Sequence, residues 1–588
     1  MTQIVSTEQI FYVDTDKGDD KASGTLEEPF QSLDRALFIV KQRVEVGIRS
    51  DKIYLRGGVY RKESVKTLYW LELKGTKDNY AVISAMPAAP HAPGAVQRKS
   101  GEWYEHVIID DAHIVKTHWV KDGDRPYVWK TNPGFIRSVW YDNATWPWRG
   151  IDLPVERKHK TLFTVAPYML LQDGEPTLWA VKPEDIVQPG MRHYDQESDT
   201  LYLRPLDDKN PNDCLIETWY AGPEEDGKML LDGEGRSLFD GNMEYAAIRG
   251  IEFRMFTRLF EFKRREMSDE SERVYQRHVL FEDNECRYGW IQILLDANVV
   301  FREDKETFTR FDDRSNWHVR NNVFYRASRE VCQLHGRNHI FEYNDIIERN
   351  GPWAGPAACV SIVNTRNTID MKVRYNYIEN QGDNPWHPGS VFMIESDAHA
   401  DENGDYIFGG QTYEGNIIVN VNGGITMVLG KGSARMRNIT IRNNTFIRSK
   451  KGPTIVISSP HKNLVIENNL FYGQQEVFAI CDNFRSYPKP LLFESMPNTI
   501  SIRNNIFAKN KKCFDSRLLA EAERSQVNIE QNLFYQNGDK PAGHSFIEKD
   551  PLFADESTND FRVPKDSPLY KNKEVIGPYG KKAEQERD

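Results

Sequence analysis

Short segments of alternating apolar and polar residues recur through the second half of the chain, each followed by an asparagine and an apolar pair. Examples are VRNNVFYR, IRNNTFIR and IENNLFYG. The asparagine stands at these nine positions: Asn284, Asn322, Asn344, Asn376, Asn416, Asn444, Asn469, Asn505 and Asn532. Successive intervals run from 22 to 40 residues. A minimum spacing with irregular excess is typical of a parallel β-solenoid, in which insertions lengthen turns without disturbing the stack.

The recurring asparagines are interpreted as scaffold. Asparagine tolerates the left-handed backbone conformation of a tight turn, and its amide can bond to the asparagine one coil away. We therefore expect a ladder of amide side chains and no chemistry from these positions.

A second strand recurs between these turns, as in GWIQILLDA, SVFMIESDA and GGITMVLGK. Alternation in a strand places successive side chains on opposite faces. The expected inward residues are Ile293, Leu334, Ile362, Ile394 and Met427. The expected outward residues are Gln333, His335, Ser361, Glu395, Asp397 and Thr426. Stacking of coils then predicts one polar face.

The chain start predicts a strand, a Gly/Asp turn and a helix from about Leu33 with Ser32 as N-cap, covering the open end of the solenoid. DTDKGDD reads as a turn rather than a calcium loop, because Gly18 is one place early. Residues 85–240 lose the periodicity and predict an inserted antiparallel β-sandwich-like element. The expected organisation is 1–84 cap and first coils, 85–240 insertion, and 241–588 main solenoid with a C-terminal cap.

Composition narrows the function classes. Among 588 residues, 76 Lys and Arg stand against 87 Asp and Glu, a net charge of −11 without a basic run, which disfavours a nucleic-acid partner. No apolar stretch is long enough for a membrane span, and six cysteines without CxxC spacing predict no zinc site. No cofactor or metal is expected. MTQIVSTEQIFYV lacks a signal-peptide pattern, so we expect a cytoplasmic protein, or a secreted or periplasmic one if a leader was removed.

The opening YVDTDKGDDKASGTLEEPFQSLDRAL and the closing DPLFADESTNDFRVPKDSP resemble the two ends of right-handed parallel β-helix carbohydrate-active proteins. The order of parts is similar to the β-helix glycoside hydrolases, above all a β-xylosidase family with an inserted β-sandwich and an α-fucosidase/xylanase family. The resemblance implies an all-β fold, a right-handed parallel β-helix with an inserted antiparallel β element and an N-terminal capping helix. It implies a carbohydrate partner, leaves a homo-oligomer open, and implies Glu395 as nucleophile or base, with Asp397 as its alternative. The family usually has Asp at this position, and strand 423–431 lacks the expected second carboxylate.

Glycosidases need two carboxyl groups across the scissile bond. Glu395 and Asp397 are two residues apart, about 6.6 Å by strand rise, which suits inversion. Alternatively, Asp397 repels Glu395 and raises its pKa into the range of a general acid. Asp296 is a further acid candidate, and His335 beside Gln333 could bond a sugar or transfer a proton.

Residues in and near the long loops around Glu395 complete the expected substrate groove. Aromatic residues stack on sugar rings and basic residues suit a uronate or sulfate. The candidates for substrate binding are Trp353, Asn364, Trp386, His387, His399, Tyr413, Arg337 and Lys431. The leading hypothesis is a glycoside hydrolase acting on a plant or algal polysaccharide or its oligosaccharides. A polysaccharide lyase or epimerase using His335 with Arg337 or Lys431, and a non-catalytic carbohydrate-binding β-helix, are the alternatives.

Overall fold

A computed structural model provides the structure of the chain. It describes residues 8–61, 69–133, 169–180, 182–195, 198–219, 237–256, 258–262, 266–267, 274–289, 291–295, 298–301, 307–310, 313–327, 330–349, 361–364, 368–381, 390–396, 405–429, 435–450, 452–457, 461–480, 499–523, 527–539, 546–564, 567, 570–571 and 574–575. The chain forms two compact units. The first comprises Met1–Cys332, Glu348–Cys359 and Gly382–His387, and the second comprises Gln333–Ile347, Val360–Gln381 and Pro388–Asp588.

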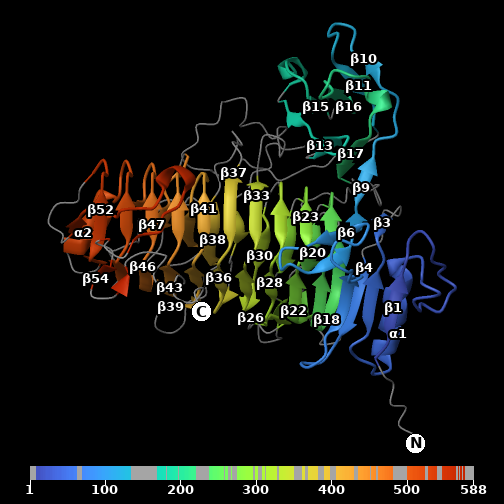
Figure 1. Cartoon of the computed structure of the whole chain (residues 1–588), viewed down its shortest axis with the longest axis horizontal. Helices are drawn as coiled ribbons and strands as arrows, with labels where there is room; N and C mark the ends of the chain where they lie inside the picture. Colours follow the sequence, from blue (N-terminus) through green and yellow to red (C-terminus); the bar gives the residue numbers. More distant parts are fainter. Residues whose placement is uncertain are drawn as a thin grey trace, which may run out of the picture. The chain divides into compact units, whose positions relative to one another are not determined.

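Parallel strands stack coil upon coil in the first unit, drawn from blue to green in Figure 1. One row contains β1 (Ile10–Val13), β2 (Lys52–Leu55), β5 (Ala81–Ala85), the end of β18 (Ser237–Arg249), β22 (Gln276–Glu282) and β28 (His318–Arg320). A second row contains β3 (Gly58–Arg61), β8 (Val107–Asp110), β19 (Glu252–Arg254), β23 (Glu285–Arg287) and β29 (Val323–Tyr325). A third row contains β4 (Tyr69–Lys74), the start of β18, β20 (Arg258–Phe262) and β24 (Ile291–Leu295). Smaller strands are β6 (Ala95–Gln97), β7 (Trp103–Glu105), β21 (Glu266–Met267), β25 (Asn298–Phe301), β26 (Thr307–Arg310) and β27 (Arg314–Ser315).

Helix α1 (Leu33–Glu45) begins where the sequence predicts. The side chain of Ser32 accepts a hydrogen bond from the backbone N–H of Arg35, the usual N-cap contact. The helix buries the predicted apolar stripe, Leu33, Ala36, Leu37, Val40 and Val44, at i, i+3, i+4 spacing. The preceding DTDKGDD segment forms a turn, in which the Asp14 carboxylate accepts from the backbone N–H groups of Asp16 and Lys17.

The second unit repeats the same coil, from yellow to red in Figure 1. Its first row contains β32 (Ile340–Glu342), β36 (Lys372–Arg374), β40 (Thr412–Glu414), β43 (Arg435–Arg442), β46 (His461–Glu467), β49 (Ile500–Arg503) and β51 (Val527–Glu530). Its second row contains β37 (Tyr377–Gln381), β41 (Ile417–Val419), β44 (Thr445–Ile447), β47 (Leu470–Tyr472), β50 (Ile506–Ala508), β52 (Asn532–Tyr535) and β53 (Phe546–Glu548). Its third row contains β34 (Ser361–Asn364), β38 (Ser390–Ser396), β42 (Ile425–Leu429), β45 (Ile455–Ile457) and β48 (Phe478–Ile480). Further elements are β30 (Cys332–Leu334), β31 (Gly336–Arg337), β33 (Asp345–Arg349), β35 (Thr368–Ile369), β39 (Asp405–Gly409), β54 (Tyr570–Lys571), β55 (Glu574–Val575) and α2 (Ser516–Glu523).

The asparagine ladder is present at the corner between the first and second rows. Asn444 is fully buried. Its Oδ1 accepts two hydrogen bonds from Asn416, one from the backbone N–H at 3.0 Å and one from the side-chain Nδ2 at 2.9 Å. Asn444 in turn donates to Oδ1 of Asn469 at 3.0 Å. In the second unit the same bonds join Asn344, Asn376, Asn416, Asn444, Asn469, Asn505 and Asn532. The structural role predicted for these residues is confirmed.

The left-handed turn residue is the one before each ladder asparagine, and this corrects the sequence-based expectation. Asn443 and Asn504 have φ of 56° and 55°, whereas their neighbours Asn444 and Asn505 are absent from the residues with positive φ. Asparagine is placed in the ladder because its amide both donates and accepts inside the coil.

Charge alternates at the residue two positions before each ladder asparagine. In the first row of the second unit, strand pairing places each of these residues beside the corresponding residue of the next coil. The residues are, in order, Glu342, Arg374, Glu414, Arg442, Glu467, Arg503 and Glu530. Ion pairs join Arg442 to Glu414 at 3.0 Å and Arg503 to Glu467 at 2.8 Å. Opposite charges directly across parallel strands favour this register of the coils over a slipped one.

Replacing Arg442 by glutamate is expected to lower the free energy of unfolding by about 1–2 kcal/mol, because three carboxylates then face one another in successive coils. Arg442→Gln is the matched control, since it removes the attraction without adding repulsion. Urea unfolding at low and high salt checks this: the gap between the two variants should shrink in high salt. Equal stability of the two variants at low salt would show that the alternation of charge does not contribute to the free energy of unfolding.

The inserted element consists of two largely antiparallel sheets between Ala112 and Trp219. One contains β10 (Val120–Lys121), β11 (Trp129–Thr131), β14 (Leu178–Trp179), β15 (Met191–Asp195) and β16 (Thr200–Leu203), and the other β9 (Ala112–Ile114), β12 (Leu170–Gln172), β13 (Glu175–Pro176) and β17 (Ile216–Trp219). Their shared core is Val115, Trp119, Leu170, Tyr194, Leu201, Leu203 and Ile216. β8, inside the expected 85–240 boundary, pairs in parallel with β3 and β19, so the antiparallel element begins after it.

The closing segment of the chain packs along the outer face of the second row. Phe561 is 1% exposed and lies 4.6 Å, centroid to centroid, from Tyr472. It completes an apolar cluster with Val419, Ile447, Leu470, Ile506, Ala508 and Leu533. The described part of the chain is therefore a parallel β-helix with an inserted β element and a capping helix, as predicted. None of its described helices has the length and apolar character required to cross a bilayer.

Candidate functional site

The strand that carries Glu395 has the inward residues that the sequence predicts. β38 pairs with β42 so that Ile394 faces Met427 and Glu395 faces Val428. Ile394 is 2% exposed and Met427 is fully buried. Since alternate residues of a strand lie on opposite faces, position 395 is on the outer face of the coil.

The outer face of β38 and β42 is covered at the positions beside Glu395. Met393 shares the face of position 395 and is fully buried, and its pairing partner Thr426 is 5% exposed. One coil further, Val456 pairs with Thr426 and is half-buried. Position 395 is therefore beside a covered part of the sheet.

One register in this row differs from the expectation. Val363 pairs with Phe392, whose ring packs 5.1 Å from that of Tyr413 in the interior. Val363 consequently takes the inward position that was predicted for Ile362, and Ser361 shares its face. Asn364 pairs with Met393 and so lies on the outer face with position 395.

Gln333 and His335 form the polar contact that the structure describes among the predicted site residues. The two side chains lie on one side of the chain, opposite the fully buried Leu334, with Gln333 Nε2 3.2 Å from His335 Nε2. An amide nitrogen only donates, so His335 Nε2 accepts and the proton of a neutral ring is on Nδ1. His335 is 5% exposed, so the contact with Gln333 lies in a buried part of the coil.

A second histidine, His339, contacts the backbone of this turn. His339 is fully buried, and its Nε2 donates to the backbone carbonyl of His335 at 2.9 Å. Burial lowers the pKa of His339 to about 4. Burial also lowers the pKa of His461 to about 3.

These buried neutral histidines predict acid sensitivity. Unfolded histidine takes up a proton near pH 6.5, but native His339 does so only near pH 4, so stability is lost as the pH falls through this window. The expected loss from His339 is about 3 kcal/mol. Denaturant unfolding at pH 7 and pH 4.5 checks it: His339→Gln should lose less stability on acidification than the wild type, and an unchanged pH slope would contradict the assignment.

Tyr413 is not part of the expected groove. Tyr413 is fully buried in the centre of β40, because the alternation of that strand turns it into the interior against Phe392. Arg337 lies in β31, which pairs with β35 and not with the row of β34 and β38. Gly336, with φ of 117°, bends the chain between His335 and Arg337.

Several predicted site residues lie outside the described residues: Asp296, Trp353, Trp386, His387, Asp397, His399 and Lys431. Glu395 and Asn364 are described by their strands alone. Within the described ranges, no three or more His, Cys, Asp or Glu side chains are grouped to hold a metal ion.

One exposed feature was not predicted from the sequence. Tyr343 and Tyr375 occupy the left-handed position before the ladder asparagine, and their rings stack. The signal was visible in FEYND and VRYNY, where most other copies of the segment carry Asn, Asp or Gly.

Comparison with solved structures defines the fold class as a parallel β-helix. The structure of XylC in complex with xylose aligns over 93% of this chain and 87% of its own, with a TM-score of 0.56 and 14% identity. A glycoside hydrolase aligns over 91% and 98% with a TM-score of 0.42 and 11% identity. The GH136 lacto-N-biosidase from Eubacterium ramulus aligns over 90% and 68% with a TM-score of 0.35 and 10% identity. No family model matches the chain, and no curated protein matches it.

Proposed function

We propose that the protein is a glycoside hydrolase with Glu395 as one carboxylate of its catalytic pair. The observation that supports this most is the register of β38, which puts position 395 on the outer face beside buried Met393. The fold shared with XylC, which was solved with xylose, supports a sugar as the ligand class. A rigid strand is a suitable support for a catalytic carboxylate, because it holds the group in one position.

In this proposal Glu395 acts as nucleophile or base, and Asp397 is the candidate for the second carboxyl group. Cleavage needs one carboxylate to attack or to activate water and one carboxylic acid to protonate the leaving oxygen. His335 directly follows β30, which pairs with β34, the strand next to β38. In this proposal it assists by transferring a proton or by bonding a sugar hydroxyl.

The test is a panel of neutral and uronate-containing oligosaccharides from plants and algae, read by release of reducing ends. Glu395→Gln should abolish the release, and Glu45→Gln, at the exposed end of α1, should leave it unchanged. Release at the wild-type rate by Glu395→Gln would remove Glu395 from the mechanism.

A lyase or epimerase is the second candidate, favoured by the contact that holds the His335 ring against Gln333. Such enzymes remove a proton next to a uronate and need a cation beside the base. Ultraviolet absorbance of an unsaturated product, lost in His335→Gln and kept in Glu395→Gln, would favour this candidate over the hydrolase.

A further inference from the structure

Two tyrosines occupy backbone positions that disfavour large side chains. Tyr343 and Tyr375 both have φ of 55°, in the left-handed region that costs about 1–2 kcal/mol for an ordinary residue. In the following coils of the second unit the same position is taken by Gly415, Asn443, Asn468, Asn504 and Gln531. Most of these are residues that tolerate the conformation, so the two tyrosines impose a cost that their neighbours avoid.

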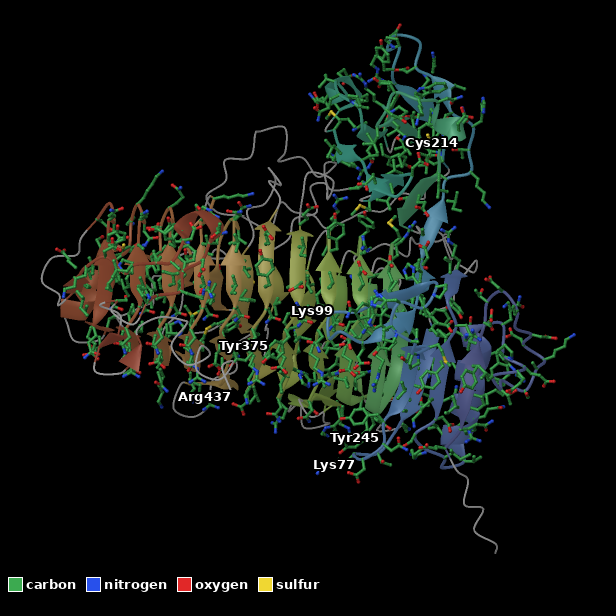
Figure 2. All side chains as sticks on the ribbon, viewed as in Figure 1. Lys77, Lys99, Cys214, Tyr245, Tyr375 and Arg437 are labelled. Carbon is green, nitrogen blue, oxygen red and sulfur yellow. The ribbon has the colours of Figure 1, made fainter. Side chains whose placement is uncertain are left out.

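The two rings form a stacked pair on the outside of the coil. Their centroids are 5.2 Å apart with 22° between the planes, and Tyr343 is 39% exposed. Gly415 makes room for the ring of Tyr375, since a Cβ at Gly415 would lie 2.5 Å from Cδ1 of that ring. Tyr375 is labelled in Figure 2 and is half-buried.

Charges around the rings compensate one another. Arg374 lies 5.6 Å from the Tyr375 ring centroid and pairs with Glu342 at 2.5 Å. Glu414 pairs with Arg442 in the next coils. The rings therefore stand in a polar but locally neutral setting, which gives no net attraction to a polyanion.

We propose that Tyr343 and Tyr375 form a sugar-binding platform for an uncharged stretch of polysaccharide. Tyr343 lies at the corner between β32 and β33 and Tyr375 at the corner between β36 and β37, apart from the row of β38. The two rings cover one face of each other, so a sugar would contact the exposed part of Tyr343 and the outer edges of the pair. Aromatic rings pack against the apolar C–H groups of sugars, and the polar groups beside them can bond hydroxyls. Asn443 and Asn468 continue the same line, one per coil of about 4.8 Å. The choice of ligand rests on the proposed function, but the platform needs no catalysis.

A purely structural role for the ring pair makes the opposite prediction for one substitution. Asparagine is what the row itself uses at this backbone position, so Tyr343→Asn with Tyr375→Asn relieves the strain of the left-handed conformation. If the rings serve binding, this double variant keeps or gains thermal stability and loses affinity for polysaccharide. If they serve packing alone, it loses stability and keeps its affinity.

The experiment is affinity electrophoresis through gels containing arabinoxylan, mixed-linkage β-glucan or polygalacturonate, done in the Glu395→Gln background so that no turnover is needed. We expect retardation by a neutral polymer, weakened at least tenfold in the double tyrosine variant. Tyr127→Asn, which removes a 54% exposed ring from the inserted element, is the control and should be retarded like its parent.

The outcomes separate this inference from the proposed function. Retardation with no cleavage of any oligosaccharide by the wild-type protein would support the platform and contradict the hydrolase. Cleavage of short oligosaccharides with no retardation by any polymer, equal retardation of the double variant, or retardation by polygalacturonate alone would overturn the platform.

Discussion

Glu395→Gln is expected to lower kcat for glycan cleavage by about 10³-fold or more, the largest effect of any single change in the chain. Glutamine keeps the size of the side chain but can neither attack nor accept a proton at neutral pH. KM should change little, because the amide keeps the size and shape of the side chain. Steady-state kinetics on the best substrate of the oligosaccharide panel checks the prediction.

Stability separates a catalytic effect from a folding effect here. β38 is held by Val391, Phe392, Met393 and Ile394, which are 0–2% exposed, so an isosteric change at position 395 should leave the melting temperature unchanged. Asp397→Asn, tested alongside, should also lose activity if it supplies the second carboxyl group. A melting temperature that falls together with the activity would contradict a catalytic role.

Asn444→Leu is expected to cost at least about 4 kcal/mol of unfolding free energy, the largest stability effect that we predict. The side chain is fully buried and donates to the carbonyls of Tyr413 and Arg442 while accepting from Asn416. Leucine has a similar volume but leaves these buried groups without partners, at about 1–3 kcal/mol each. Chemical denaturation of the whole chain measures the loss.

Asn528→Leu is the matched control for the ladder. Asn528 lies in β51 of the same unit, and its amide donates to Glu530 on the exposed surface. The change should cost less than about 0.5 kcal/mol. Equal losses in the two variants would show that the buried ladder contributes no more than a surface contact.

Much of the fold was predictable because the coil repeats its local chemistry. Ser32 and the stripe from Leu33 to Val44 predicted α1, and Ile394 and Met427 were correctly placed inward. These are local rules, a cap and a period, which act within a few residues. They do not specify register across long loops, which is why Val363 and not Ile362 turned out to face inward.

The candidate site was less predictable. Tyr413 was expected beside the substrate because it follows a long loop, but the short strand β40 directs it into the core. The bend at Gly336 moved Arg337 into another row. A shift of one residue along a strand moves a side chain to the other face of the sheet. A bend in the chain likewise moves the residues after it into another row.

By itself the sequence determined the repeating features of the coil. These are an asparagine at one corner of each coil from Asn284 to Asn532, a tyrosine before two of these asparagines, and alternating glutamate and arginine two positions before them. These features recur along the chain, so each copy of the segment has a similar local environment. Only the tertiary structure decided which residues of different coils meet. Stacking brings Arg442 against Glu414 and Tyr343 against Tyr375, pairs separated by 28 and 32 residues, and such contacts depend on loop lengths that no local pattern encodes.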